Sequence, residues 1–291
     1  MSRIIDCYTS YKARLGEGVF WHPLYQKLYW IDIENKKILI LDPKTNQLDQ
    51  HLLPKKIGTI VPEKQGSLLV ALEDGVARYH TSTQELDYVC KLEQDKPDNR
   101  FNDGKCDPQG RFWLGSMHRD AQRPTGSLYR IDNDMTISTI EENVRVSNGL
   151  TWSLDYRKMY YIDSPTHKVV EYDYNKETGH VSNKKVCIEI PSDKGSPDGM
   201  TIDQNGNLWI ALWDGYAVGC YDPNTGQQID KIEVPCPRPT CCAFGGASQD
   251  LLYITSAYHE LSEETLNKYP DSGCVFVAEM NSPGPEVFFF G

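Results

Sequence analysis

Short apolar runs alternate with polar turns along the chain, and many of these runs come in pairs. They are rich in Tyr, Trp, Ile, Val and Leu, a composition typical of β-strands. Turn-forming segments separate them, for example residues 42–44, 132–134, 175–179 and 222–226. Six pairs are present, at residues 28–32 and 37–43, 67–72 and 75–79, 111–115 and 126–131, 158–163 and 169–173, 207–212 and 217–222, and 251–255 and 273–277.

The pairs recur at a regular spacing. Equivalent positions are Leu28, Leu68, Phe112, Met159, Leu208 and Leu252. A period of roughly 40–50 residues with about four short strands per unit is typical of a propeller blade. The sequence therefore predicts an all-β fold, a six-bladed β-propeller formed by residues 1–291 as a single domain. Two β-sandwiches are the alternative, but they would not account for six similar units.

Six units imply a closed ring, so the two ends of the chain should meet. We expect residues 4–13 to pair with the last blade near residues 286–290 and leave no open sheet edge. Sustained helical periodicity is absent from the pattern, and residues 261–269 are expected to form one short helix inside the last unit.

Acid or amide side chains precede glycine near the start of four units. The pairs are Glu17-Gly18, Asp103-Gly104, Asn148-Gly149 and Asp198-Gly199. Each pair alone could simply form a turn. Their common register favours a different interpretation, because the first strand of every propeller blade lines the central channel and equivalent positions converge on one axis.

Glu17, Asn148 and Asp198 together offer two carboxylates and an amide oxygen. Such a set of hard oxygen ligands suits Ca²⁺, Mg²⁺ or Mn²⁺. His does not occur at an equivalent blade start, so a His-rich zinc site is not indicated. We therefore expect a central axial metal site, with coordination positions left for water or substrate.

Composition excludes several classes of partner. The net charge is −11 without a compensating basic cluster, which disfavours nucleic acid. No run of about 20 apolar residues predicts a membrane span, and the polar start does not resemble a secretory signal. Nine scattered Cys without a C-x-x-C pair favour buried or half-buried free thiols, and hence a cytoplasmic protein. A closed ring needs no partner, so we expect a monomer.

Several longer segments resemble one family. Residues 15–21, 100–110, 147–153 and 197–200, together with 158–164 and 243–246, are similar to the senescence-marker-protein/gluconolactonase family, which includes regucalcin and an insect branch containing luciferin-regenerating enzyme. The resemblance runs from about residue 14 to the C-terminus. It implies a six-bladed propeller with one catalytic divalent cation, for which we expect Ca²⁺, with Zn²⁺, Mg²⁺ or Mn²⁺ as alternatives.

The resemblance also implies residue roles. Glu17, Asn148 and Asp198 would be the metal ligands, and Asp198 would also act as the general base. Arg100 and Asn102 would hold substrate hydroxyls and ring oxygens; the alternative for Arg100 is a surface ion pair with an acid such as Asp98. The implied activity is metal-dependent hydrolysis of a small-molecule sugar lactone, in which the metal polarises the carbonyl.

The chain departs from the vertebrate pattern near the expected site mouth. It has Met117-His-Arg-Asp120 where the vertebrate branch has Met-Ala followed by two acids. Asp120 would contact substrate, and residues 120–125 are expected to form a lid. This departure leaves the sugar open, and similar proteins also hydrolyse organophosphates or act on a nitrile in luciferin recycling.

Two other functions stay open at this stage. The same oxygen site could hold Ca²⁺ in a non-enzymatic calcium-binding or regulatory protein, although no EF-hand loop is present. The propeller could also be an interaction scaffold, because residues 28–32 resemble a YWTD repeat and Trp213-Asp214 resembles a WD repeat. Each of these motifs occurs once and not once per blade, which argues against the scaffold.

Overall fold

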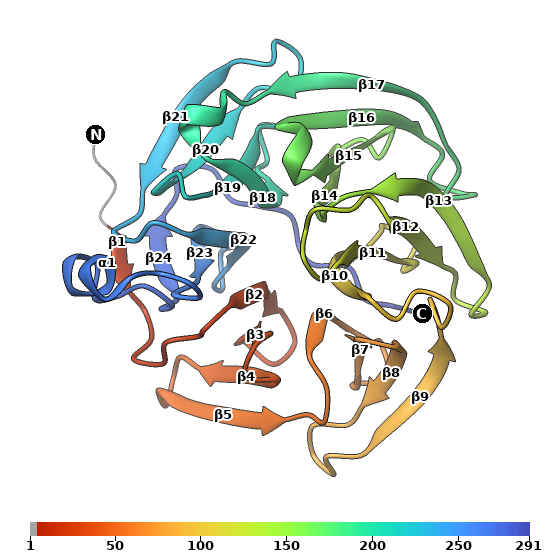
Figure 1. Ribbon diagram of the computed structural model, residues 1–291, viewed down its shortest axis with the longest axis horizontal. Coiled ribbons are helices and arrows are strands. Elements are labelled where there is room, and N and C mark those ends of the chain that lie inside the picture. Colours follow the sequence, from red (N-terminus) through yellow and green to blue (C-terminus); the bar gives the residue numbers. More distant parts are fainter. Residues whose placement is uncertain (1–4) are drawn as a thin grey trace.

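Six four-stranded antiparallel sheets surround a central axis in the computed structural model, which describes residues 5–291 (Figure 1). The predicted all-β, six-bladed propeller is confirmed. The paired apolar runs of the sequence are the two middle strands of each blade.

The blades follow one another along the chain. The first three consist of β2 (Gly16–His22), β3 (Lys27–Asp32), β4 (Lys37–Asp42) and β5 (Gln47–Leu52); β6 (Ile57–Pro62), β7 (Leu68–Leu72), β8 (Gly75–Tyr79) and β9 (Leu86–Lys91); and β10 (Asn99–Cys106), β11 (Phe112–His118), β12 (Gly126–Ile131) and β13 (Ile137–Val144). The other three consist of β14 (Ser147–Trp152), β15 (Lys158–Asp163), β16 (Lys168–Tyr174) and β17 (Val181–Glu189); β18 (Ser196–Ile202), β19 (Leu208–Trp213), β20 (Ala217–Tyr221) and β21 (Gln228–Glu233); and β22 (Pro239–Gly245), β23 (Leu251–Ser256), β24 (Phe276–Glu279) and β1 (Ile5–Cys7).

The hydrophobic core is divided among the interfaces between neighbouring blades. In β19, Ile210 packs toward the fourth blade, whereas Trp209 packs toward the sixth. Side chains of a strand point alternately to its two faces. The middle strands are therefore apolar at nearly every position, because both faces of each sheet are covered by the next blade.

The outermost strands are mostly polar. β5 and β21 are exposed or half-buried at all but one position, Ile232 in β21. Their sequences lack an apolar run because only the inner edge of each of these strands is covered by the sheet. This explains why the pattern of apolar runs in the sequence predicted the two middle strands of each blade but not the outermost strand.

The ring is closed by the N-terminal strand, but not where the sequence predicted. Ile5 pairs with Ala278 and Cys7 pairs with Phe276, so β1 forms the outer edge of the last blade. The prediction that residues 286–290 are the partner was therefore wrong. Ile4, the first residue of the N-terminal segment that was expected to pair, lies outside the described residues. The C-terminal segment instead runs beneath the ring, where the Phe290 backbone N–H donates to the Pro62 carbonyl over 2.8 Å.

The physical reason lies in the apolar end of the chain. Phe290 is buried in the cluster between the second and third blades, and Phe288 packs against the same cluster. This packing holds the C-terminal segment away from the edge of the last sheet.

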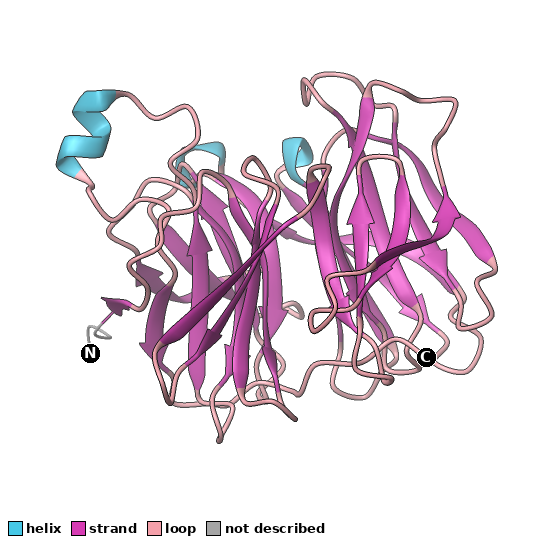
Figure 2. Ribbon diagram, turned by 90° about the horizontal axis from the view of Figure 1, so that it is seen from below, coloured by secondary structure: helices cyan, strands magenta, loops and turns pink. Residues whose placement is uncertain are grey.

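Helices are few and short. α1 (Glu263–Lys268) lies within the predicted 261–269 segment, and its first turn is capped by Ser262, whose hydroxyl accepts from the Thr265 backbone N–H. Two 3₁₀ turns, η1 (Ser164–Thr166) and η2 (Ser192–Lys194), lie on the same face of the ring as α1, and the C-terminus lies on the opposite face (Figure 2). Among the described helices, none has the length and apolar character needed to cross a bilayer.

A buried aspartate anchors the turn at residues 107–110. Asp107 is fully buried, and its carboxylate accepts from the Arg111 Nε (2.6 Å), the Trp113 Nε1 (3.0 Å) and the Tyr174 hydroxyl (2.8 Å). Tyr174 belongs to the next blade, so this network joins two blades. Asp203 makes the equivalent bond to the Trp209 Nε1 in the fifth blade.

Replacing Asp107 should therefore destabilise the fold strongly. We expect Asp107→Ala to lower the free energy of unfolding by about 3 kcal/mol, because it leaves the Arg111 guanidinium buried without its partner. Asp222→Ala, at an exposed turn, is the matched control and should cost about 1 kcal/mol or less. Urea unfolding measures both, and equal losses would contradict the anchoring role of Asp107.

Candidate axial site

The innermost strand of each blade is irregular at a similar level. The pairing register shifts between Glu17 and Phe20 in β2 and between Pro197 and Met200 in β18. Equivalent shifts occur in the other inner strands, at 57–59, 101–104, 147–150 and 239–242. A bulge redirects the side chains within it. The acid–glycine and amide–glycine pairs of the sequence therefore lie in these bulges.

Glycine is required where neighbouring inner strands meet. A Cβ atom on Gly149 would lie 2.5 Å from the Asp198 carbonyl oxygen, and one on Gly58 would lie 2.5 Å from the Phe101 carbonyl oxygen. No side chain fits at such distances. The close approach of the backbones brings the Asn148 and Asp198 side chains to one axis.

Five of the six predicted site residues lie at buried or half-buried positions of one axial cavity of 710 Å³. Glu17 (8% exposed), Asn148 (5%) and Asp198 (5%) line it from three different blades. Arg100 and Asn102 line it from β10.

The sixth predicted residue, Asp120, borders the same cavity but is exposed. It lies after the end of β11, and its carboxylate is 2.6 Å from the His118 Nδ1. The buried His118 thus positions the Asp120 loop, a partnership that the sequence did not reveal. Whether residues 120–125 act as a lid stays a prediction.

Hydrogen bonds orient the amide of Asn148. Its Nδ2 donates to the Ser164 Oγ (2.9 Å), which in turn donates to the Pro197 carbonyl (2.6 Å). Asn102 donates through its Nδ2 to the Ser147 carbonyl (2.8 Å). Because the Asn148 Nδ2 is bound to Ser164, its Oδ1 is left as an acceptor, and the Asn102 Nδ2 donates to this oxygen over 3.4 Å. Ser164 was missed by sequence reasoning, since it follows a strand and carries no motif of its own.

Asp198 has an unusual environment for a carboxylate. Its Oδ1 is buried and has no hydrogen-bond partner within the described chain. Burial raises the pKa of Asp198 well above its ordinary value, and the nearby Asp103 raises it further. Burial, followed by the charges of Asp198 and Asp103, likewise raises the pKa of Glu17 well above its ordinary value.

Asp103 is the third acid of this cluster, and sequence reasoning did not assign it a role. It is buried, its Oδ1 accepts from the Gly104 backbone N–H (2.7 Å), and it faces the channel below the large cavity. Burial raises the pKa of Asp103 above its ordinary value, and the charge of Lys105 opposes this effect. The register shifts at 101–104, 147–150 and 197–200 make Asn102 the equivalent of Asn148 and Asp198, so Asp103 lies one residue beyond that position and its acid–glycine pair did not identify its place.

The cluster lacks sufficient positive charge. Three buried acids face Arg100 and Lys105, and the Lys105 Nζ already donates to the Met200 carbonyl (2.8 Å). Buried carboxylates without a counter-charge are costly. A hard divalent cation would supply that charge, and the oxygens of Glu17, Asn148 and Asp198 are of the right chemical type to bind it.

Arg100 does not form the surface ion pair considered as an alternative. Its Nη1 donates to the Asn102 Oδ1 (2.7 Å) and to the Phe101 carbonyl (3.0 Å), and it does not contact the Asp98 side chain. Burial lowers the pKa of Arg100, whereas the charges of Glu17 and Glu34 oppose this effect. The guanidinium is thus held against the acidic cluster.

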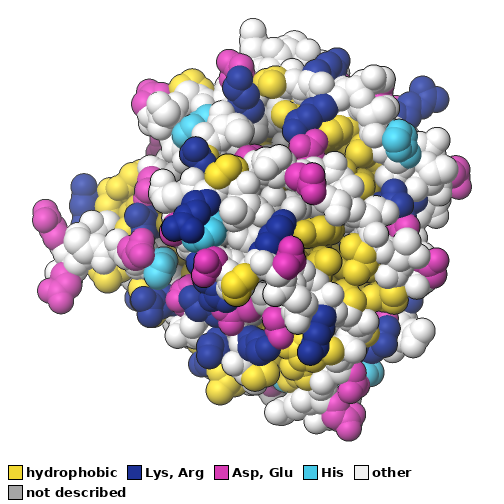
Figure 3. All heavy atoms as spheres, turned by 45° about the vertical axis from the view of Figure 1, so that its right-hand side comes forward, with side chains coloured by type: hydrophobic (Ala, Val, Ile, Leu, Met, Phe, Trp, Pro, Cys, Tyr) yellow, Lys and Arg dark blue, Asp and Glu magenta, His cyan; other side chains and the backbone are white. Residues whose placement is uncertain are grey.

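Charged side chains surround the cavity mouth in opposite-charge pairs. The Arg119 Nη1 lies 2.5 Å from the Glu73 Oε1, and the Lys56 Nζ lies 2.6 Å from the Glu34 Oε1. Figure 3 shows basic, acidic and histidine side chains interspersed over the molecular surface. His259 of the last blade also lines the cavity.

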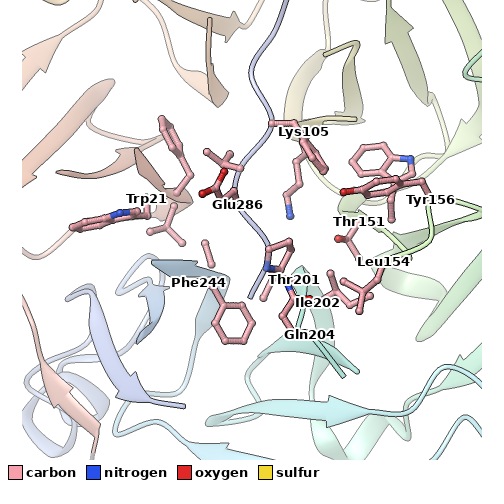
Figure 4. A pocket seen from close by; sticks show the side chains of 17 residues that line it. Trp21, Lys105, Thr151, Leu154, Tyr156, Thr201, Ile202, Gln204, Phe244 and Glu286 are labelled. Atoms are coloured by element: carbon pink, nitrogen blue, oxygen red, sulfur yellow. The ribbon is translucent and has the colours of Figure 1, made fainter. Parts of the chain in front are cut away.

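A smaller cavity of 160 Å³ lies on the opposite face of the ring. It is lined mainly by apolar and aromatic side chains such as Trp21, Tyr156 and Phe244, with Lys105 and Glu286 among them (Figure 4). None of the predicted site residues lines it. The C-terminal segment passes along this end of the channel, so the chemistry is concentrated at the other end.

These features define a six-bladed propeller with a cluster of buried carboxylates in its axial cavity. The chain belongs to the SMP-30/Gluconolactonase/LRE-like family, whose sequence signature matches residues 15–258. The family predicted from the sequence motifs is therefore confirmed.

Individual relatives are similar over nearly the whole chain. YvrE of Bacillus subtilis (strain 168), which is named as a sugar lactone lactonase, is 36% identical over 98% of this chain and 97% of its own. The structure of a luciferin-regenerating enzyme superposes with a TM-score of 0.93 at 32% identity, covering 99% of each chain. That of a calcium-binding protein, regucalcin, from Agrobacterium tumefaciens also has a TM-score of 0.93, at 28% identity over 97% of this chain and 95% of that one.

Cation binding at the axis should stabilise the protein. We expect Ca²⁺ or Mn²⁺ added to EDTA-treated protein to raise the free energy of unfolding by about 2.7 kcal/mol when the free ion is at about 100 times its Kd. Glu17→Gln should abolish most of this gain, because it removes one of the buried carboxylates. Thermal unfolding with and without the ion measures this gain in the free energy of unfolding.

Glu34→Gln is the matched control for that experiment. Glu34 lines the same cavity but is paired with Lys56, so the gain should persist in this variant. A gain that survives Glu17→Gln unchanged would contradict cation binding at the axis.

Proposed function

We propose that this protein is a hydrolase that opens sugar lactones with the help of one divalent cation held by Glu17, Asn148 and Asp198. The observation that carries the proposal is the buried Asp198 Oδ1, which lacks a partner and lies among further acids in a 710 Å³ cavity. The family supports it, since YvrE is named as a sugar lactone lactonase. Ca²⁺ is the expected ion, and Zn²⁺, Mg²⁺ and Mn²⁺ are the alternatives.

The bound cation would supply Lewis acidity, polarising the lactone carbonyl and making a water more acidic. Asp198 would accept the proton of the attacking water through its unpartnered Oδ1. The water would have to lie within hydrogen-bond reach of Asp198 and over one face of the carbonyl carbon. When the ring C–O bond breaks, the proton held by Asp198 would pass to the leaving ring oxygen, which becomes a hydroxyl. The buried position of the carboxylate supports that role, because bulk water cannot solvate it.

Arg100 and Asn102 would hold the substrate. In the described chain, Arg100 uses only Nη1 for its hydrogen bonds, which leaves further N–H groups to bind hydroxyl and ring oxygens. Asn102 is fixed by the Ser147 carbonyl, so it would present its amide without rearrangement. Asp120, at the exposed mouth, would accept from a hydroxyl at the outer end of the sugar.

A calcium-binding protein without catalytic activity is the second candidate. It is favoured by the likeness to the Agrobacterium tumefaciens structure, which is described as a calcium-binding protein, regucalcin. The same three oxygen ligands would serve that function, so only turnover distinguishes the two.

Lactone hydrolysis by EDTA-stripped protein tests the proposal directly. We expect hydrolysis of D-glucono-δ-lactone, or of another member of a small aldonolactone panel, to disappear on stripping. Adding Ca²⁺, Mg²⁺, Mn²⁺ and Zn²⁺ back one at a time should restore it with at least one ion. Stoichiometric ion binding without turnover of any lactone would contradict the enzyme and support the calcium-binding alternative.

Asp198 should be essential for that turnover. We expect Asp198→Ala to lower kcat by about 10³-fold or more, since it removes both a ligand and the proton acceptor. Asp193→Ala, an exposed acid in η2 five residues earlier, is the control and should keep full activity. Circular dichroism checks that both variants are folded, and wild-type turnover by folded Asp198→Ala would refute the assignment.

A further inference from the structure

A second cluster of possible metal ligands lies where the N-terminal strand pairs with the last blade. Cys7 ends β1, while Asp271 and Cys274 lie in the turn that precedes β24. One ligand atom from each of the three lies within 4.8 Å of the others. β1 and β24 lie toward the outside of the last blade, whereas β22 of the same blade lies near the axis (Figure 1). The cluster is therefore separate from the axial site.

The fold holds the three residues firmly. Cys7 is paired with Phe276 in the ladder between β1 and β24. The Cys274 backbone N–H donates to the Asp271 carbonyl (3.0 Å), and the Ser256 Oγ donates to the Cys274 carbonyl (2.7 Å). Strand pairing on one side and a bonded turn on the other therefore bring the two thiols together without strain in either segment.

The ligand chemistry differs from that of the axis. Two thiols and one carboxylate suit a borderline or soft ion such as Zn²⁺ or Cd²⁺, which takes four ligands and can complete its shell with water. Cys7 is exposed, Asp271 is half-buried and Cys274 is buried, so an ion can enter from solvent and still be held against the protein.

The local charges also favour a cation. Burial raises the pKa of the Cys274 thiol, and the neighbouring Cys7 and Asp271 raise it further, whereas Lys12 is the cation that opposes them. The Lys12 Nζ donates to the Pro270 carbonyl (2.5 Å). At the buried Cys274 thiol, one lysine thus opposes two acidic neighbours.

We propose that Cys7, Asp271 and Cys274 form a second metal site, specific for Zn²⁺-like ions, that ties the N-terminal strand to the last blade. The site does not depend on lactone hydrolysis. Its structural consequence is a metal cross-link between the N-terminal strand and the last blade, which adds to the ladder of residues 5–7 and to the backbone bonds from Tyr8 to Val275 and from Ala13 to Gly273.

Cd²⁺ titration of the reduced full-length protein tests this site. Excess Ca²⁺ is present throughout to occupy oxygen ligands, because Ca²⁺ does not bind thiolates well. We expect a Cd²⁺–thiolate charge-transfer band in the ultraviolet that saturates at one ion per chain, and Zn²⁺ should compete for the same site.

Three variants make the test specific. Cys7→Ser should abolish the saturable band, and its exposed position keeps the fold intact. Asp271→Asn should keep the band but weaken the affinity by about tenfold or more. Cys187→Ser, a half-buried thiol in the fourth blade whose Sγ donates to the Val169 carbonyl, should leave both stoichiometry and affinity unchanged.

Hydrogen exchange gives a second readout. Zn²⁺ should slow amide exchange in residues 5–7 of the wild type and leave Cys7→Ser unaffected. An unchanged band in Cys7→Ser would overturn the proposal. So would a disulfide between Cys7 and Cys274 in the isolated protein together with no Cd²⁺ binding after reduction, which would identify the pair as a redox cross-link.

Discussion

Packing of each sheet between two neighbours is the constraint on which the rest of the structure depends. Middle strands such as β19 present apolar side chains on both faces, so no blade can bury its surface alone. Each blade requires one neighbour on either side, and six blades satisfy this requirement only as a ring. The short ladder between β1 and β24 is the point at which the chain completes it.

The ring geometry creates the site. Because every blade begins with its innermost strand, residues as distant in sequence as Glu17 and Asp198 line the same cavity. Bulges redirect their side chains, and glycines such as Gly149 let the strands approach closely. The interblade packing thus provides the stability that offsets the cost of burying several acids together.

The axial cluster and the cluster of Cys7, Asp271 and Cys274 differ in the metal ions that their ligand atoms suit. At the axis, oxygens from separate blades meet around a deficit of positive charge, which suits a hard ion open to substrate. At the outside of the last blade, two thiols meet because the N-terminal strand β1 pairs with β24, and such a pair suits a softer ion with a structural role. The difference is set by which residue types the ring brings together, and the backbone architecture is the same in both places.

Much of the candidate site could be predicted from the sequence. Glu17, Asn148 and Asp198 share a register with the repeat, and their register alone indicated convergence on an axis. Asp103 lies one residue beyond the position equivalent to Asn148 and Asp198, which Asn102 holds, so Asn102 lines the large cavity and Asp103 the channel beneath. Ser164 and His118 act through hydrogen bonds to Asn148 and Asp120, and neither contact follows from sequence spacing.

The sequence by itself determined the number of blades and their middle strands, because the alternation of apolar runs with polar turns is a local property that repeats with each blade. It also determined which positions face the axis, since equivalent positions in a ring must converge. Only the tertiary structure decided how the ring closes. Residues 5–7 and the C-terminal segment could both have extended the last sheet, and Phe290 is instead buried between the second and third blades. That choice depends on the apolar surface buried across distant blades, which no local pattern records.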